Sequence, residues 1–245
     1  MVMPPAFKTL LVPSVCSLLL AAQSALAAPP EWTAVKTDNL SEWTDPSQWW
    51  KAENGVIVAE SKGGPNLPKV HYLGWNGAPI KGEFEVRLDY RIITSAPSDA
   101  GMNFRVERPF KQAPNIPSYQ AELDTCNLFG VNNGKLFGHI HDGKRGRMFP
   151  RNTKVVIHAD GTEKKEPLGT AFDPAKVFKA PPEWNECLVR VVGEKVELFL
   201  NGVLANEIND GDQQKRPEGD GIALQFRPSE NARFEVKDLK YRLLK

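Results

Sequence analysis

The stretch from Phe84 to Ile92, FEVRLDYRI, decides the fold class because apolar and polar residues alternate along its whole length. A period of two is the pattern of a β-strand with one buried face and one polar face. Alternation of the same kind recurs in Val196–Leu200, Ile222–Phe226 and Phe234–Val236. Little helical periodicity appears anywhere in the chain, so the sequence predicts an all-β protein.

Turn signals separate these predicted strands. Asn54-Gly55, Asn133-Gly134 and Asn201-Gly202 are dipeptides that favour tight hairpins. Hairpins join antiparallel strands, whereas a parallel α/β fold would need crossover helices. We therefore expect an antiparallel β-sandwich of the jelly-roll type.

Two segments are expected to be long loops. Residues 108–118 carry three prolines, and residues 142–183 are longer and irregular, with one short strand predicted at 154–159. Long ordered loops in compact domains often border functional sites. We expect these two segments to flank one.

The first 27 residues have the features of a secretory signal peptide. Lys8 is followed by a short apolar region, and Ala25-Leu26-Ala27 has the small residues of a cleavage site. The apolar region is shorter than the roughly 20 residues of a spanning helix. The expected organisation is a signal peptide at 1–27 and a single exported domain at 28–245, periplasmic or extracellular, without a membrane span.

Charge and cysteine content narrow the partners and the redox chemistry. The net charge is +1, so composition favours neither nucleic acid nor an anionic membrane as partner. Beyond the signal segment the chain has Cys126 and Cys187. In an oxidising compartment these two residues would form one disulfide or remain as two buried thiols, and the sequence leaves both options open.

Strand parity brings polar side chains of three predicted strands to one sheet face. The strands lie within residues 99–107, 119–124 and 222–227. A solvated sheet face is the ordinary alternative, but such faces favour Lys, Glu and Thr, whereas this one favours Arg, amides and acids. These groups suit sugar hydroxyls. The residues expected on the face are Asn103, Arg105, Gln120, Glu122, Asp124, Gln225 and Arg227.

Further candidates stand beside this face. Trp75 lies in a Gly-Trp-Asn-Gly stretch that we expect to be a loop, where an indole could stack on a sugar ring, and Tyr119 begins one of the three strands. His139 and His141 would share a strand face and form a weak candidate metal pair. Two histidines do not make a metal site, and surface histidines at a strand end are commoner.

The quoted motifs resemble those of the 3-keto-disaccharide hydrolase domain family, also known as DUF1080. The matching stretches are WWKAENGVIV at 49–58, FEVRLDYRI at 84–92, DAGMNFR at 99–105, YQAELD at 119–124, EWNE at 183–186, LNGV at 200–203 and GIALQ at 221–225. The resemblance implies an exported protein with a concanavalin-like jelly roll. Asp99-Ala100 stands where the family usually has Asn-Ser, and Gln120 and Glu122 exchange the usual order of acid and amide.

The resemblance also implies cleavage of glycosides whose sugar is already oxidised to a ketone at C3. That ketone acidifies the C2 hydrogen, so a base can start elimination of the C1 oxygen, and water then adds. We expect Glu122 or Asp124 to act as base and Arg105, with or without a divalent cation, to stabilise the enolate. Asn103, Tyr119, Gln120, Trp75, Gln225 and Arg227 would bind the sugar.

Three other functions fit the same sequence. A non-catalytic lectin-like module would use the same face only to bind carbohydrate. An ordinary glycosidase would use two carboxylates on an unoxidised sugar. A purely structural exported domain is the last alternative.

Overall fold

The computed structural model describes residues 30–44, 48–62, 70–94, 98–124, 136–170, 172–227 and 232–244. The predicted signal peptide at 1–27, Cys126 and the Asn133-Gly134 turn lie outside these residues. Cys187 is a free, fully buried thiol. No helix among the described residues is long and apolar enough to cross a membrane.

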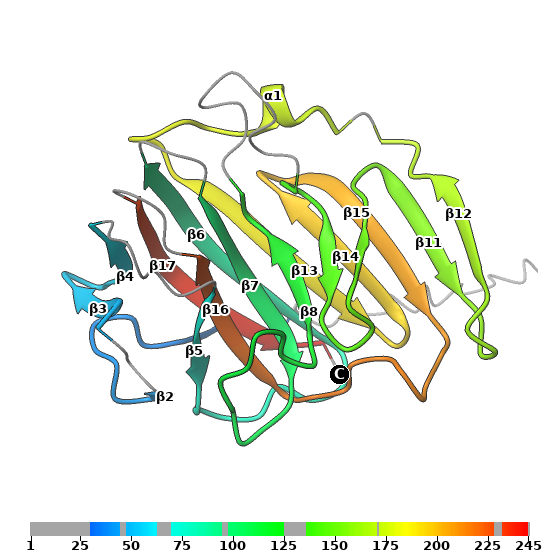
Figure 1. Ribbon diagram of the computed structural model, residues 1–245, viewed down its shortest axis with the longest axis horizontal. Coiled ribbons are helices and arrows are strands. Elements are labelled where there is room, and N and C mark those ends of the chain that lie inside the picture. The colour runs from blue at the N-terminus through cyan, green and yellow to red at the C-terminus, as the bar shows by residue number, and fades with distance from the viewer. Residues whose placement is uncertain are drawn as a thin grey trace, which may run out of the picture.

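Two β-sheets stack face to face (Figure 1). The larger, sheet A, has the spatial order β12 (Glu163–Pro167), β11 (Thr153–Ile157), β15 (Val203–Asp210), β14 (Lys195–Leu200), β13 (Asn185–Val192), β6 (Phe84–Thr94), β17 (Ala232–Leu243), β4 (Val56–Ser61), β3 (Trp50–Glu53), with β1 (Thr33–Ala34) paired to β17. The smaller, sheet B, has the order β10 (Arg147–Phe149), β9 (Ile140–Asp142), β8 (Tyr119–Glu122), β7 (Asp99–Val106), β16 (Gly221–Arg227), β5 (His71–Trp75), β2 (Trp43–Thr44).

The inward faces of the two sheets form one hydrophobic core. On β6, the apolar half of the alternating stretch, Val86, Leu88 and Tyr90, is fully buried. Its polar half faces outward into ion pairs, such as that of Arg87 with Glu186 at 2.7 Å. Among the described strands every pairing is antiparallel except that of β11 with β15. The predicted all-β antiparallel sandwich is confirmed.

The expectation for residues 142–183 is partly wrong. Besides the predicted strand, now β11, the segment holds β10, β12 and the short helix α1 (Pro174–Val177). Strand β12 has the sequence EKKEP and pairs with β11 at the edge of sheet A. A charged edge strand needs no buried face and discourages aggregation, so it carries no alternating signal. Residues 108–118 contain no strand, as predicted.

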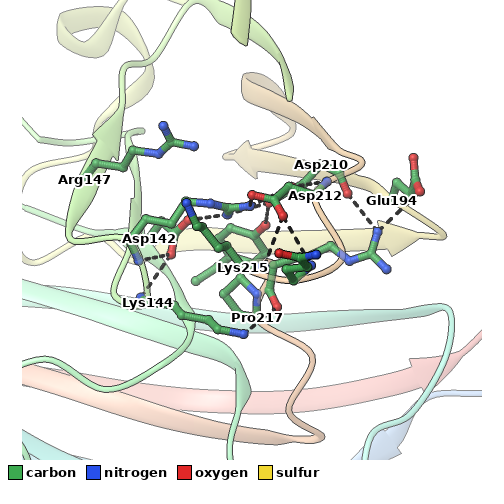
Figure 2. Close-up of polar contacts among 12 residues, drawn as sticks. Asp142, Lys144, Arg147, Glu194, Asp210, Asp212, Lys215 and Pro217 are labelled. Carbon is green, nitrogen blue, oxygen red and sulfur yellow. Dashed lines mark hydrogen bonds and ion pairs between the residues drawn. The ribbon is translucent and has the colours of Figure 1, made fainter. Parts of the chain in front are cut away.

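One buried ion-pair cluster ties the two sheets together at one end (Figure 2). The Arg145 guanidinium donates to Asp142 Oδ2 at 2.6 Å and to Asp210 Oδ2 at 2.7 Å. It also lies 3.2 Å from Asp212 Oδ2. Because Asp142 ends β9 in sheet B and Asp210 ends β15 in sheet A, this single guanidinium crosses the sandwich. The Tyr119 hydroxyl donates to the same Asp210 carboxylate.

Removing the guanidinium tests how much this cluster stabilises the fold. Arg145→Met leaves three buried carboxylates without their cation, so we expect a loss of about 3–5 kcal/mol in the free energy of unfolding. Urea denaturation measures it. Arg147→Met, two residues away, is the matched control because its ion pair with Glu163 is partly exposed, and we expect a change within about 1 kcal/mol. Equal effects of the two substitutions would contradict the account.

Candidate functional site

The outer face of sheet B carries a chain of amide side chains that are almost excluded from water. Asn103 on β7, Gln120 on β8 and Gln225 on β16 are all buried. Asn103 Nδ2 donates to Gln120 Oε1 at 3.2 Å, and Gln120 Nε2 donates to Gln225 Oε1 at 3.2 Å. Sequence parity predicted that these three residues share a face, and the structure brings them together.

A small residue and a loop explain why this face is dry. Gly101 has no side chain, and a Cβ there would lie 2.6 Å from Gln120 Nε2, so glycine leaves the space that the amide fills. Residues 108–118 fold over the face, and Ser118 Oγ accepts from Asn103 Nδ2 at 3.0 Å. Ile116 from this loop packs with Tyr72 and with apolar neighbours on the sheet. The loop therefore borders the site, as predicted.

Two carboxyl groups meet at the end of the amide chain. Asp99 on β7 and Glu122 on β8 lie on the same face, close enough for each to shift the pKa of the other. Glu122 is 3 % exposed, whereas the Asp99 side chain is 18 % exposed and lies 3.2 Å from the Arg227 guanidinium. Two neighbouring carboxyl groups disfavour ionisation of each other, because like charges repel.

The surroundings of the two carboxyl groups favour protonation of one over the other. Burial, followed by the charges of Asp99 and Asp124, raises the pKa of Glu122 well above its usual range. Burial also raises the pKa of Asp99, but Arg227 and, less strongly, Glu122 oppose that shift. Desolvation and a neighbouring like charge both disfavour ionisation of the more buried acid. Of the two acids, Glu122 is the one whose protonated form burial and neighbouring charge favour more strongly.

Two further groups face the pair. Burial and the charges of Glu122 and Asp99 raise the pKa of the Tyr72 hydroxyl to about 12, so it stays protonated. His141 on β9 lies opposite Gln120. Burial lowers its pKa, while Asp142 and Asp99 partly oppose that change. Asp124 lies two residues beyond Glu122, just past the end of β8, and is half-buried.

The predicted histidine pair does not form a metal centre in the described part of the chain. His139 Nδ1 lies 3.0 Å from the Leu136 carbonyl, and burial and Arg151 lower the pKa of His139 to about 4. No three His, Cys, Asp or Glu side chains among the described residues are placed to hold a metal ion.

The grouping of Arg105 with Glu122 is wrong. Val106 pairs with Gly221 and Phe104 pairs with Ile222, so Arg105 is the extra residue of a β-bulge, with a positive φ of 52°. A bulge reverses strand parity beyond it. Val106 accordingly joins the small apolar cluster on the outer face. The Arg105 side chain instead reaches the Gly193 and Pro217 carbonyls at 3.2 and 3.3 Å.

Trp75 and Tyr119, which we expected to bind the sugar, are both buried, so that expectation is also wrong. Trp75 ends strand β5 and is 4 % exposed, packed against Tyr241 with its Nε1 donating to Glu42. Tyr119 is fully buried between the sheets. Alternation along β8 already points Tyr119 away from Gln120 and Glu122, so parity alone could have excluded it.

Asp99 and Tyr72 are the residues that sequence reasoning missed. Asp99 has the same parity as Gly101 and Asn103, which is a usable signal, but it lies at the start of its strand, where the strand's extent was uncertain. Tyr72 belongs to a short strand with no clear alternation, HYLGW, and its place opposite Gln225 depends on long-range pairing.

The comparisons with known proteins bear on the whole described sandwich. Residues 31–241 match the profile of the 3-keto-alpha-glucoside-1,2-lyase-like domain. The chain belongs to this family. No curated protein matches it. The family match spans every residue of the polar face described above, so the face belongs to the family domain.

Solved structures place the fold among carbohydrate-active and carbohydrate-binding proteins. A candidate glycosyl hydrolase from Parabacteroides distasonis matches with a TM-score of 0.53 and 16% identity over 87% of this chain and 100% of the other. The carbohydrate-binding module CBM66 from Bacillus subtilis matches with a TM-score of 0.50 and 13% identity over 86% and 99%. The Emp46p carbohydrate recognition domain matches with a TM-score of 0.50 and 10% identity over 83% and 88%. These likenesses establish a concanavalin-like jelly roll.

The raised pKa of Glu122 makes a testable contribution to stability. An acid whose pKa is higher in the folded than in the unfolded state binds its proton more tightly when folded. Its contribution is fully present below the unfolded value and is lost as the pH rises through the folded value. Glu122→Gln removes this loss, so the stability of the variant relative to wild type should rise as the pH increases above the ordinary range of a glutamate carboxyl.

Urea denaturation at several pH values measures this effect. Glu183→Gln, at an exposed position, is the control and should follow the wild-type profile. A Glu122→Gln profile parallel to wild type would show that the Glu122 carboxyl ionises in its ordinary range.

Proposed function

We propose that this domain is a carbohydrate-active enzyme that cleaves the glycosidic bond of 3-keto-glycosides at the Asp99–Glu122 pair. Family membership supports the substrate class. The observation that carries the proposal is the pair of neighbouring carboxyl groups on a dry, amide-lined sheet face. Export to the periplasm or the extracellular space, directed by residues 1–27, is part of the same proposal.

Exposure assigns different roles to the two acids. Asp99 is the more accessible carboxyl and lies beside Arg227, which is 59 % exposed, so Asp99 is the group that meets the substrate. Glu122 is the more deeply buried acid and, in its protonated form, would donate to Asp99 and favour its ionised form. This assignment moves the base from Glu122 or Asp124, as first expected, to Asp99, and makes Glu122 a positioning residue.

The proposed reaction is an elimination followed by hydration. Ionised Asp99 removes the C2 proton, which the C3 ketone acidifies, and the electron pair forms the C3 enolate. The enolate then expels the C1 oxygen, leaving a C1=C2 double bond, and Asp99 returns its proton to that oxygen. Water adds hydroxyl to C1 and hydrogen to C2, which gives the products of hydrolysis. Arg227 takes the place first expected for Arg105 in stabilising the enolate oxygen.

Substitution of Asp99 tests the assignment of the base. Asp99→Asn removes the proton acceptor and should lower kcat on a 3-keto-disaccharide by about 100-fold or more. Asp89→Asn, on the outer face of sheet A, is the control and should leave kcat unchanged. Turnover by Asp99→Asn at the wild-type rate would remove Asp99 from the mechanism.

Two substitutions of Glu122 test its positioning role. Glu122→Gln keeps a hydrogen-bond donor toward Asp99 and should retain kcat within about tenfold, whereas Glu122→Met removes the donor and should lose more. The pH profile of kcat/KM should also differ: without the donor, the pKa of Asp99 rises and the acid limb moves to higher pH. Equal kcat values and equal profiles for the two variants would contradict this role.

A carbohydrate-binding module without catalysis is the second candidate, because the same jelly roll is found in CBM66 and a fold does not determine function. Calorimetry with a 3-keto-disaccharide and its unoxidised parent, combined with product analysis, separates the two candidates. Release of monosaccharide only from the 3-keto substrate supports the enzyme. Binding of both sugars without any product supports the binding module.

A further inference from the structure

A cleft lies at one end of the sandwich, and neither Asp99 nor Glu122 lines it. It has a volume of ≈ 530 Å³ and is bordered by residues 80–84, the tip of the β13–β14 hairpin at Gly193, and the loop that leads into β16. Arg105 and Arg216 both line it. The cleft is large enough for a monosaccharide-sized ligand.

The β-bulge on β7 directs Arg105 into this end of the sandwich. The residue has a φ of 52°, a conformation that costs a non-glycine residue energy and that is concentrated at functional sites. Asn or Gly would adopt this conformation more easily. The bulge therefore points the Arg105 guanidinium away from the outer face of sheet B and toward the cleft.

The Arg105 guanidinium is half-buried, and no carboxylate among the described residues forms an ion pair with it. It donates to the Pro217 and Gly193 carbonyls at 3.3 and 3.2 Å, and its Nε is buried with no partner in the described part of the chain. Burial and the like charge of Arg216 lower its pKa, and Asp210 and Glu218 oppose this only through longer-range attraction. An arginine fork with free donors suits a carboxylate.

Most carboxylates around the cleft are already paired. Glu218 accepts from Arg216 at 2.5 Å, and Asp220 lies 3.7 Å from both Lys81 and Arg108. Glu83 is the remaining lining carboxylate, and its charge would repel an incoming anion. The cleft therefore contains Arg105, which can bind an anion, and Glu83, which would repel one. Substitutions of these two residues should have opposite effects on anion binding.

We propose that this cleft binds the carboxylate of a small hydroxylated ligand, such as a sugar acid, through Arg105. The Nη groups of Arg105, which each have a second hydrogen to donate, would bind the carboxylate. The backbone carbonyls along the rim would accept hydrogen bonds from hydroxyl groups. The proposal is independent of the chemistry assigned to Asp99 and Glu122.

Isothermal titration calorimetry with the full domain tests the proposal, using D-glucuronate, D-glucose and inorganic phosphate as probes. Glucuronate should bind at least about tenfold more tightly than glucose, because only glucuronate offers a charged partner to the guanidinium. Equal affinity for the two sugars would overturn the proposal. Tighter binding of phosphate than of glucuronate would overturn the assignment to a carboxylate.

Three variants locate the binding. Arg105→Gln should weaken glucuronate binding by about tenfold or more, and Arg105→Lys should weaken it less because a point charge replaces the fork. Glu83→Gln leaves the bulge intact and should tighten binding by removing repulsion. Unchanged affinity in Arg105→Gln and Glu83→Gln would place the ligand elsewhere. Glu122→Gln, which alters the proposed catalytic face, should bind glucuronate like wild type.

Discussion

The buried Arg145 guanidinium is the interaction on which the arrangement of the candidate site depends. It holds the end of β9 in sheet B against the end of β15 in sheet A through Asp142 and Asp210. The Tyr119 hydroxyl also bonds to Asp210, so the first residue of β8 is anchored in the same cluster. Gln120 and Glu122 follow on that strand. The Arg145 ion-pair cluster between the sheets therefore anchors β8, the strand that carries Glu122 on the outer face of sheet B.

The second constraint is the alternation of side chains along β7, β8 and β16. It sends Met102, Leu224 and their apolar neighbours into the core and leaves amides and acids on the opposite face. Because Gly101 has no side chain and residues 108–118 cover the face, those polar groups lie in a dry environment where charges are costly. In such an environment burial raises the pKa of an acid such as Glu122.

Much of this arrangement could be predicted from the sequence because alternation is a local signal. The strands around Val86 and the polar face with Gln120 and Gln225 follow from it, whereas the loop at residues 108–118 was predicted from its three prolines. The predictions that were wrong concerned features that depend on contacts between residues far apart in the sequence. The bulge that redirects Arg105 exists only because Gly221 pairs with Val106, and the burial of Trp75 depends on the packing of Tyr241 against it. The edge strand β12 has no buried face, so its sequence lacks the alternation that would predict a strand. Asp99 became a candidate only when pairing placed it beside Glu122.

The central claim is that burial keeps the Glu122 carboxyl protonated at neutral pH beside Asp99. Side-chain carboxyl ¹³C NMR across a pH titration observes this directly, with Glu122→Gln to assign the signal. We predict one buried carboxyl that remains protonated near about pH 7 and whose signal disappears in the variant. Titration of both carboxyl groups in the ordinary range of exposed acids would contradict the account.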